Sequence, residues 1–185
     1  LDLLSRKENV PHAEDIMPIV FGSETVSYEG ETYRPTIFGG TELMAEIYDI
    51  YPDQGRNISG DDVRGGADVV ILGSTVVEAL APGGNLLGER IKIKGRNFLV
   101  IGILPKKGGS SFINFDEMAM VPYTTAQNYI FGIKYFNRIA VRADTEANIN
   151  TTVEDIKATL RNAHNITDPE KDDFGVETQA DALKT

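Results

Sequence analysis

The chain contains only two histidines, His12 and His164, and this limits the catalytic chemistry that it could perform. A Ser-His-Asp triad would need one of them as its base. His12 follows a proline in a predicted loop, and His164 stands at a predicted helix end, where a cation offsets the helix dipole. The sequence has no Gly-x-Ser-x-Gly nucleophile elbow and no cysteine for a thiol nucleophile or metal ligand. We therefore predict no catalytic residue, and a hydrolase is disfavoured.

Neither the glycine-rich stretch nor the clustered carboxylates have the spacing of a phosphate or calcium site. Gly83–Gly88 departs from Gly-x-Gly-x-x-Gly, and no Gly-Lys-Ser/Thr follows a glycine-rich turn. These glycines are predicted to supply positive φ in turns. Asp168–Asp173 lacks the alternating ligands and the final Glu of an EF-hand, which favours a solvated loop. We predict no cofactor and no metal.

One loop, Lys106–Phe115, combines apolar side chains with flexible small residues and is the candidate functional segment. It places Phe112, Ile113 and Phe115 beside Gly108–Ser111. Aromatic side chains next to a mobile loop often anchor protein interfaces, so these three are the predicted partner-binding residues. Alternatively, the same side chains fold under the loop and cover the core.

Composition restricts the partners that this chain could bind. At 185 residues it suits one domain or two small lobes, and its net charge of -10 argues against nucleic acid and anionic lipid headgroups. Protein or neutral ligands remain. No apolar run approaches the about 20 residues that cross a bilayer, and the chain starts without Met. We expect a soluble fragment excised from a longer protein.

The centre of the chain predicts a strand, a helix and a hairpin in close succession. The predicted elements are a strand at Asp68–Leu72, a Gly73-Ser74 turn, a helix at Thr75–Leu80 with a Thr75/Glu78 capping box, and hairpin arms at Arg90–Lys94 and Phe98–Leu104. Ile91 and Ile93 share one face, and the second arm is apolar on both faces, which places it inside a sheet. A strand at Met118–Pro122 and a short helix capped by Thr124 or Thr125 follow, ending at Gly132.

The two ends of the chain supply further elements. The predicted N-terminal elements are a strand at Ile16–Phe21, hairpin arms at Thr25–Tyr28 and Glu31–Phe38, a helix at Thr41–Tyr51 and a turn at Asp61-Asp62. Near the C-terminus, a strand at Arg138–Ala143, a helix at about Asn148–Ala163 with a Thr151/Glu154 capping box, and a strand at Phe174–Thr178 predict a βαβ unit.

The order of these elements resembles the periplasmic core domain of MacB-type ABC transporter permeases, a module related to that of lipoprotein-releasing permeases. The matching segments are Gly55-Arg56, Val69–Gly73, Gly88–Ile93, Phe98–Leu104 and Val121–Thr125. The resemblance covers about Gly39 to Asp181.

The resemblance implies an α+β fold with two lobes. A porter-like βαβ lobe would comprise residues 1–40 and 137–185, and residues 41–136 would form an inserted mixed α/β lobe. It also implies a non-catalytic domain on the extracytoplasmic side of the membrane, within an integral membrane protein, that couples ATP-driven motion to substrate export or partner engagement.

The partners implied by the resemblance are the protein's own transmembrane helices, an ATP-binding cassette subunit or domain, a second permease copy and an extracytoplasmic adaptor or carrier protein. The alternative function is a stand-alone binding module for a small ligand or peptide.

Overall fold

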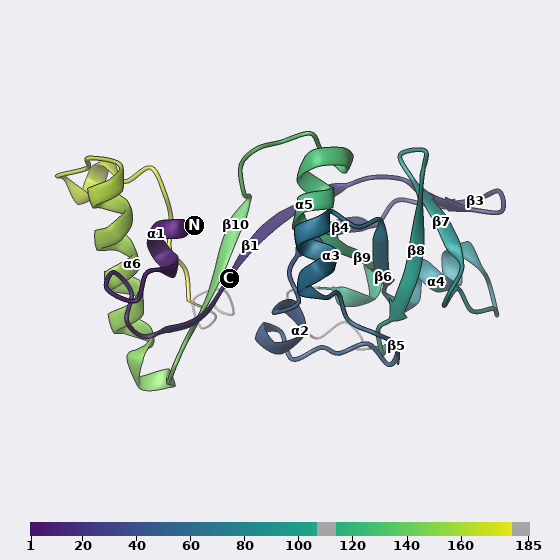
Figure 1. Cartoon of the computed structure of the whole chain (residues 1–185), viewed down its shortest axis with the longest axis horizontal. Helices are drawn as coiled ribbons and strands as arrows, with labels where there is room; N and C mark the ends of the chain where they lie inside the picture. Colours follow the sequence, from purple (N-terminus) through teal and green to yellow (C-terminus); the bar gives the residue numbers. More distant parts are fainter. Residues whose placement is uncertain (107–113, 179–185) are drawn as a thin grey trace. The chain divides into compact units, whose positions relative to one another are not determined.

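A computed structural model describes residues 1–106 and 114–178 of the chain, which divide into two compact units. Unit 1 comprises Leu1–Ile16 and the chain from Ile139 onward, and unit 2 comprises Met17–Arg138. Strands and helices occur in both units (Figure 1), and the predicted α+β class is confirmed. The predicted lobe boundary at residue 40 differs from this division, because residues 17–40 form strands that pair within unit 2.

Unit 2 holds most of the strands and a set of short helices. Its strands are β1 (Ala13–Ser23, which begins in unit 1), β2 (Val26–Tyr28), β3 (Glu31–Tyr33), β4 (Thr36–Gly40), β5 (Gln54–Gly55), β6 (Val69–Leu72), β7 (Arg90–Ile93), β8 (Arg96–Ile103) and β9 (Met118–Pro122). Its helices are α2 (Met44–Ile47), α3 (Gly60–Gly65), α4 (Ser74–Leu80), η1 (a 3-10 turn, Phe115–Glu117), α5 (Tyr123–Thr125) and η2 (a π-helical turn, Ala126–Ile130).

The sheet of unit 2 is curled, because one continuous segment of chain pairs with strands on two sides of it. Its strand order is β1-β4-β9-β6-β8-β7-β2-β3, with β5 added to β8. β1 pairs with β4 through Val20–Ser23, and β2 pairs with β7 through Val26 and Ser27. Only Glu24 and Thr25 separate β1 from β2, so the two far sides of the sheet are joined by a single short link.

A hydrophobic core fills the space that the curled sheet encloses. Fully buried side chains reach it from β2, β6, β7 and β8, among them Val26, Val70, Ile93 and Phe98. Ile91 and Ile93 both point inward, as their alternation with Arg90 and Lys92 predicted. β8 lies between β6 and β7, which confirms its predicted position inside the sheet.

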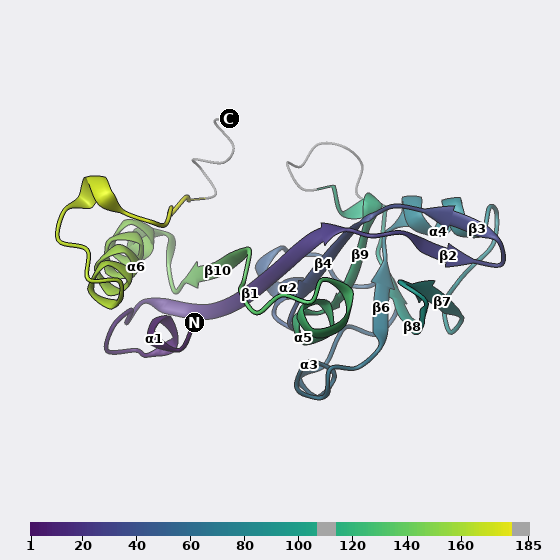
Figure 2. The ribbon, with the colours of Figure 1, turned by 90° about the horizontal axis from the view of Figure 1, so that it is seen from above.

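Two helical segments close opposite ends of this core. β6 and β9 run antiparallel, α4 follows β6, and α5 with η2 follows β9. The two helical segments therefore leave the sheet at opposite edges, and they lie on opposite sides of the strands in both views (Figures 1 and 2). Val76 and Leu80 of α4 and Ala126 and Ile130 of η2 enter the same core.

The two tight hairpins turn on residue pairs with positive φ. Glu29-Gly30 joins β2 to β3 with φ values of 46° and 85°, and Lys94-Gly95 joins β7 to β8 with 53° and 83°. Such turns match the right-handed twist of the strands that they connect. The predicted turn at Glu29-Gly30 is confirmed, but the second predicted arm is interrupted before Pro35 and resumes as β4 in the middle of the sheet.

Several predicted helix boundaries were wrong. The helix expected over Thr41–Tyr51 is confined to α2, and Asp61-Asp62 lies in helix α3 rather than in a turn. The N-cap residue of α4 is Gly73 rather than Thr75, and no side-chain hydrogen bond caps this helix. These differences reflect local backbone geometry that a pattern of apolar residues does not determine.

Unit 1 packs one long helix against two strand segments. The first residues of β1 lie beside β10 (Arg138–Ala143), and α6 (Ile149–Ala163) follows the 3-10 turn η3 (Glu146–Asn148). Helix α1 (Asp2–Ser5) and the turn η4 (Pro169–Lys171) complete the unit. Ile156 of α6 packs with Leu4, Val10 and Ala13, so the predicted apolar stripe meets the N-terminal segment.

Two predictions for unit 1 are corrected by the structure. Phe174–Thr178 is not a strand; Val176 packs against the unit's core without joining a ladder. The Thr151/Glu154 capping box is absent, because the helix begins at Ile149 and Asn148 occupies the cap position. Thr152 instead donates its hydroxyl to the Asn148 carbonyl, at 2.7 Å.

Candidate functional site

Of the predicted partner-binding residues, the structure describes Phe115 but not the other two. Phe112 and Ile113 lie outside the residues that the structure describes. Phe115 begins η1 with 6% of its surface exposed, and its ring contacts that of Tyr48, with the ring centroids 5.6 Å apart. This packing corresponds to the alternative in which the aromatic side chain covers the core. A role of Phe115 in partner contact stays a prediction.

Both ends of the candidate loop are fixed to the end of strand β6. The Leu104 amide donates to the Leu72 carbonyl at 2.9 Å, and the Gly73 amide donates to the Met118 carbonyl at 2.9 Å. β8 and β9 flank β6, so two strand spacings, about 10 Å, separate the strands that carry the loop. The loop therefore leaves from, and returns to, a narrow part of the sheet edge.

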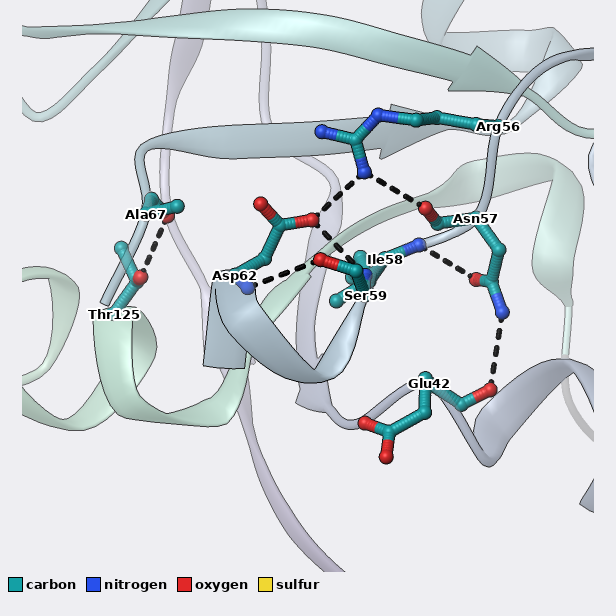
Figure 3. Close-up of polar contacts among 8 residues, drawn as sticks. All are labelled: Glu42, Arg56, Asn57, Ile58, Ser59, Asp62, Ala67 and Thr125. Carbon is teal, nitrogen blue, oxygen red and sulfur yellow. Dashed lines mark hydrogen bonds and ion pairs between the residues drawn. The ribbon is translucent and has the colours of Figure 1, made fainter. Parts of the chain in front are cut away.

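A second cluster surrounds Arg56, at the start of the connection from β5 to α3 (Figure 3). One Arg56 nitrogen, Nη1, donates to Asp62 Oδ2 at 2.8 Å and to the Asn57 carbonyl at 3.0 Å. Asp62 Oδ2 also accepts from the Ser59 amide at 2.9 Å, while Ser59 Oγ accepts from the Asp62 amide at 3.1 Å. These reciprocal bonds form a capping box that satisfies free amides at the start of α3.

The other end of α3 is bonded to α5. Thr124 Oγ1 donates to the Val63 carbonyl at 2.6 Å, and Thr125 Oγ1 donates to the Ala67 carbonyl at 2.8 Å. Thr125 is 3% exposed, so its hydroxyl satisfies a polar group away from bulk water. The prediction that one of these threonines caps its own helix was wrong, because both hydroxyls donate to carbonyls at or just beyond the C-terminal end of α3.

Asn57 connects the same cluster to the segment before α2. Its Nδ2 donates to the Glu42 carbonyl at 3.0 Å, and its Oδ1 accepts from the Ile58 amide at 2.8 Å (Figure 3). We call Arg56, Asn57, Ser59, Asp62 and Thr125 the Arg56 cluster. It links three parts of the chain that are distant in sequence: residues 56–67, the segment before α2, and α5.

Gly55 and Gly102 allow the backbone before Arg56 to pair with β8 at close range. The Arg56 amide donates to the Ile101 carbonyl at 2.8 Å. A Cβ on Gly55 would lie 2.1 Å from the Ile101 oxygen, and Gly55 also has φ of +77°. A Cβ on Gly102 would lie 2.7 Å from the Arg56 oxygen. Only glycine meets both the steric and the φ requirement at position 55.

The electrostatics of the Arg56 cluster favour an ionised Asp62 at neutral pH. Burial raises the pKa of Asp62, but hydrogen bonds from Arg56 and Ser59 and the charge of Arg56 outweigh burial, so its pKa lies below the usual value. An ionised carboxylate that accepts these bonds is a poor proton donor or nucleophile. Across residues 1–106 and 114–178, no group of three or more His, Asp or Glu side chains is arranged to hold a metal.

The sequence contained a signal for this cluster that the helix prediction missed. Ser59-x-x-Asp62 has the spacing of a capping box, and it precedes the buried Val63. Arg56 was identified only through the Gly-Arg pair of the family resemblance. The structure supplies the physical reason for that pair: the glycine permits the close approach to β8, and the arginine binds Asp62.

Comparison with known proteins identifies the family. The sequence pattern described as the MacB-like periplasmic core domain matches residues 1–159. The chain belongs to the MacB-like periplasmic core domain family. The Arg56 cluster and both ends of the candidate loop fall inside the matched residues.

One curated relative is the macrolide export ATP-binding/permease protein MacB of Bdellovibrio bacteriovorus. It is 25% identical over 181 residues, which cover 97% of this chain and 28% of the relative. The chain therefore spans little more than a quarter of that protein. This family of periplasmic domains forms part of MacB-type membrane permeases.

Two solved structures share the fold of this periplasmic core domain. The extracellular domain of the noncanonic ABC-type transporter YknZ from Gram-positive bacteria has a TM-score of 0.75 at 20% identity, covering 89% of this chain and 83% of that one. The periplasmic region of MacB from Actinobacillus actinomycetemcomitans has a TM-score of 0.72 at 19% identity, covering 85% and 73%. Among the helices that the structure describes here, none is long and apolar enough to cross a membrane.

The close approach of Gly55 to β8 predicts that adding a single methyl group there has a large effect on stability. We expect Gly55→Ala to lower the free energy of unfolding by roughly 2–4 kcal/mol, because the new Cβ meets the Ile101 carbonyl and the backbone must hold a positive φ. Urea unfolding measures the change. Gly65→Ala is the matched control, since its Cβ meets nothing within 4 Å and alanine favours helix α3. Equal stability of the two variants would contradict the steric account.

The Arg56 cluster predicts a pH-dependent contribution from one carboxylate. We expect Asp62→Asn to cost about 1 kcal/mol at pH 7, because it removes the charge that binds Arg56 and weakens the cap. The folded pKa of Asp62 is lowered, so its contribution is present above the unfolded value of about 3.9 and disappears as the pH falls. The stabilities of wild type and variant should therefore converge below about pH 4.

Asp61→Asn provides the control for this pH dependence. The Asp61 side chain is 90% exposed and pairs with the exposed Arg64. Exposed ion pairs contribute little, so this change should alter stability by less than about 0.5 kcal/mol. A difference between wild type and Asp62→Asn that stayed constant from neutral to acidic pH would show that the carboxylate charge is not involved.

Proposed function

We propose that this chain is the non-catalytic, extracytoplasmic domain of an ABC transporter permease, and that it couples ATP-driven motion to export or partner engagement outside the membrane. The observation that carries the proposal is the family match over residues 1–159. A relative named as an export ATP-binding/permease protein, of which this chain spans 28%, supports it.

The residues of unit 2 support a mechanical role in this proposal. The Arg56 cluster bonds the connection between β5 and α3 to α3 itself and to the segment before α2, and it bonds α5 to the backbone just after α3. A domain that transmits force must keep its own elements in register while it moves, and such cross-links oppose local opening. Asp62 is ionised and bonded to Arg56, which suits a structural joint better than acid-base chemistry.

We further propose which parts of the full-length protein this domain works with. ATP hydrolysis would lie in another domain or subunit, a second permease copy would complete a dimer, and an extracytoplasmic adaptor or carrier protein would bind the domain. The candidate loop supports such a contact by its composition, with Phe112 and Ile113 as anchors. Phe115, packed on Tyr48, would fix the end of the loop.

Spin-label distances in the full-length protein test the coupling without knowledge of the substrate. The chain contains no cysteine, so Lys92→Cys places a single label in this domain, on the exposed side of β7. We expect the distance between labels on two copies to differ between the ATP-bound and ADP-bound transporter. In an ATPase-deficient variant that still binds ATP, the distance between the labels should remain that of the ATP-bound state. Identical distances in both nucleotide states would remove the coupling role.

A second variant in the same experiment separates the loop from the coupling. Phe112→Ala combined with Ile113→Ala should leave the nucleotide-dependent distances unchanged and weaken capture of the transporter's adaptor protein. Ile149→Ala, which shortens an exposed apolar side chain of unit 1, serves as the control. Unchanged adaptor capture would disprove the loop as a partner site while leaving the coupling proposal intact.

A further inference from the structure

The segment that follows η2 is held firmly against β1, although it belongs to no helix or strand. Gln127 Nε2 donates to the Tyr135 carbonyl at 3.0 Å, and the Asn137 amide donates to the Ile19 carbonyl at 2.9 Å. The Phe21 amide donates to Asn137 Oδ1 at 3.0 Å. The Phe136 ring packs edge-on against Tyr123, with 5.7 Å between centroids. The backbone of this segment is therefore preorganised.

Aromatic and basic side chains project from this fixed backbone into solvent. Tyr135 is 62% exposed and Phe21 is 38% exposed. The Arg138 guanidinium lies over the Phe21 ring, 5.5 Å from its centroid, and Lys134 is also exposed. We call Phe21, Lys134, Tyr135 and Arg138 the Tyr135 surface. Tyrosine and arginine are the residue types that most often dominate binding energy at protein interfaces.

The charge of the Tyr135 surface is opposite to that of the chain. The protein has 28 acidic and 18 basic residues, yet the sequence contains no Asp or Glu from Met118 to Ala143, and Ile16–Ser23 carries no charge at all. In the described part of the chain, no carboxylate forms an ion pair with Lys134 or Arg138. By contrast, Arg56 and Arg96 of the same unit pair with carboxylates.

We infer that the Tyr135 surface binds an acidic protein segment that carries an apolar side chain beside its carboxylates. Carboxylates would pair with Lys134 and Arg138, and the apolar side chain would pack on Tyr135 and Phe21. The net charge of -10 disfavours an anionic bilayer as the occupant, because a broad anionic surface repels the rest of the chain whereas a short segment contacts only this patch. This inference does not depend on the proposed coupling.

A defined peptide and amide chemical shifts test this inference. The probe is a synthetic peptide with the sequence of residues 166–177, which combines five carboxylates with Phe174. Titrated into the isotope-labelled 185-residue chain, it should shift the amides of Phe21 and residues 134–138 and saturate. Its affinity should fall as salt rises from about 50 to about 300 mM, since salt screens exposed charges. The same peptide with every Asp and Glu changed to Asn and Gln is the matched probe.

Two variants locate the site. Tyr135→Ala and Arg138→Glu should each weaken binding at least about tenfold, a size expected for an interface anchor. Arg90→Glu should leave the affinity unchanged, because Arg90 is exposed and basic but lies on β7, outside the Tyr135 surface. The amide spectra of the variants also show whether each one is folded.

Two kinds of result would contradict the inference. Absence of saturable shifts, equal binding of the amide peptide, or equal weakening by Arg90→Glu would show that the surface does not select acidic segments. Tighter binding to vesicles containing phosphatidylglycerol than to the peptide, lost in Arg138→Glu, would assign the surface to membrane instead. Dimerisation of the chain that Arg138→Glu abolishes would support the inference, with an acidic segment of a second copy as the occupant.

Discussion

The structure of unit 2 depends on one segment, residues 17–28, which pairs with strands on two far sides of the same sheet. Val20–Ser23 pair with β4, and Val26 and Ser27 pair with β7 after a link of only two residues. This short link forces the sheet to curl, and the curl creates the enclosed core. Because the pairings are distant in sequence, they form only when the whole unit folds.

The helical segments and the Arg56 cluster act on this curled sheet in different ways. α4 and η2 close its two ends with apolar side chains, so they depend on the sheet for their burial. The Arg56 cluster instead holds the outer connections with polar bonds and with the close approach of Gly55 to β8. Apolar burial supplies most of the stability, whereas the polar bonds fix the positions of connections that would otherwise be free to shift.

The parts of the fold that could be predicted are those in which apolar residues recur at a regular spacing along the chain. Val69–Leu72 is apolar at every position and lies inside the sheet, and Ile91 and Ile93 alternate with charges and face the core. Helix α6 was predicted because its apolar residues recur on one face. In each case the spacing of apolar residues reports directly on burial.

The parts that could not be predicted depend on contacts between distant segments. Thr75/Glu78 and Ser59/Asp62 both have capping-box spacing, and only the second forms a box, because Ser59 is the N-cap of α3 whereas Thr75 lies inside α4, whose N-cap is Gly73. The pairing of β4 with β9 assigns residues 17–40 to unit 2, which no local pattern indicates. Phe115 was placed in the right loop, but its burial against Tyr48 depends on a helix far away in sequence.

Native-state hydrogen exchange tests most directly whether the curled sheet of unit 2 is one cooperative body. β4 and β7 lie on opposite sides of the sheet and are connected through the segment from β1 to β2. The account predicts that the most protected amides of β4 and β7 open with the same free energy and the same dependence on denaturant. Opening of β7 at a clearly lower free energy, while β4 stays protected, would contradict it.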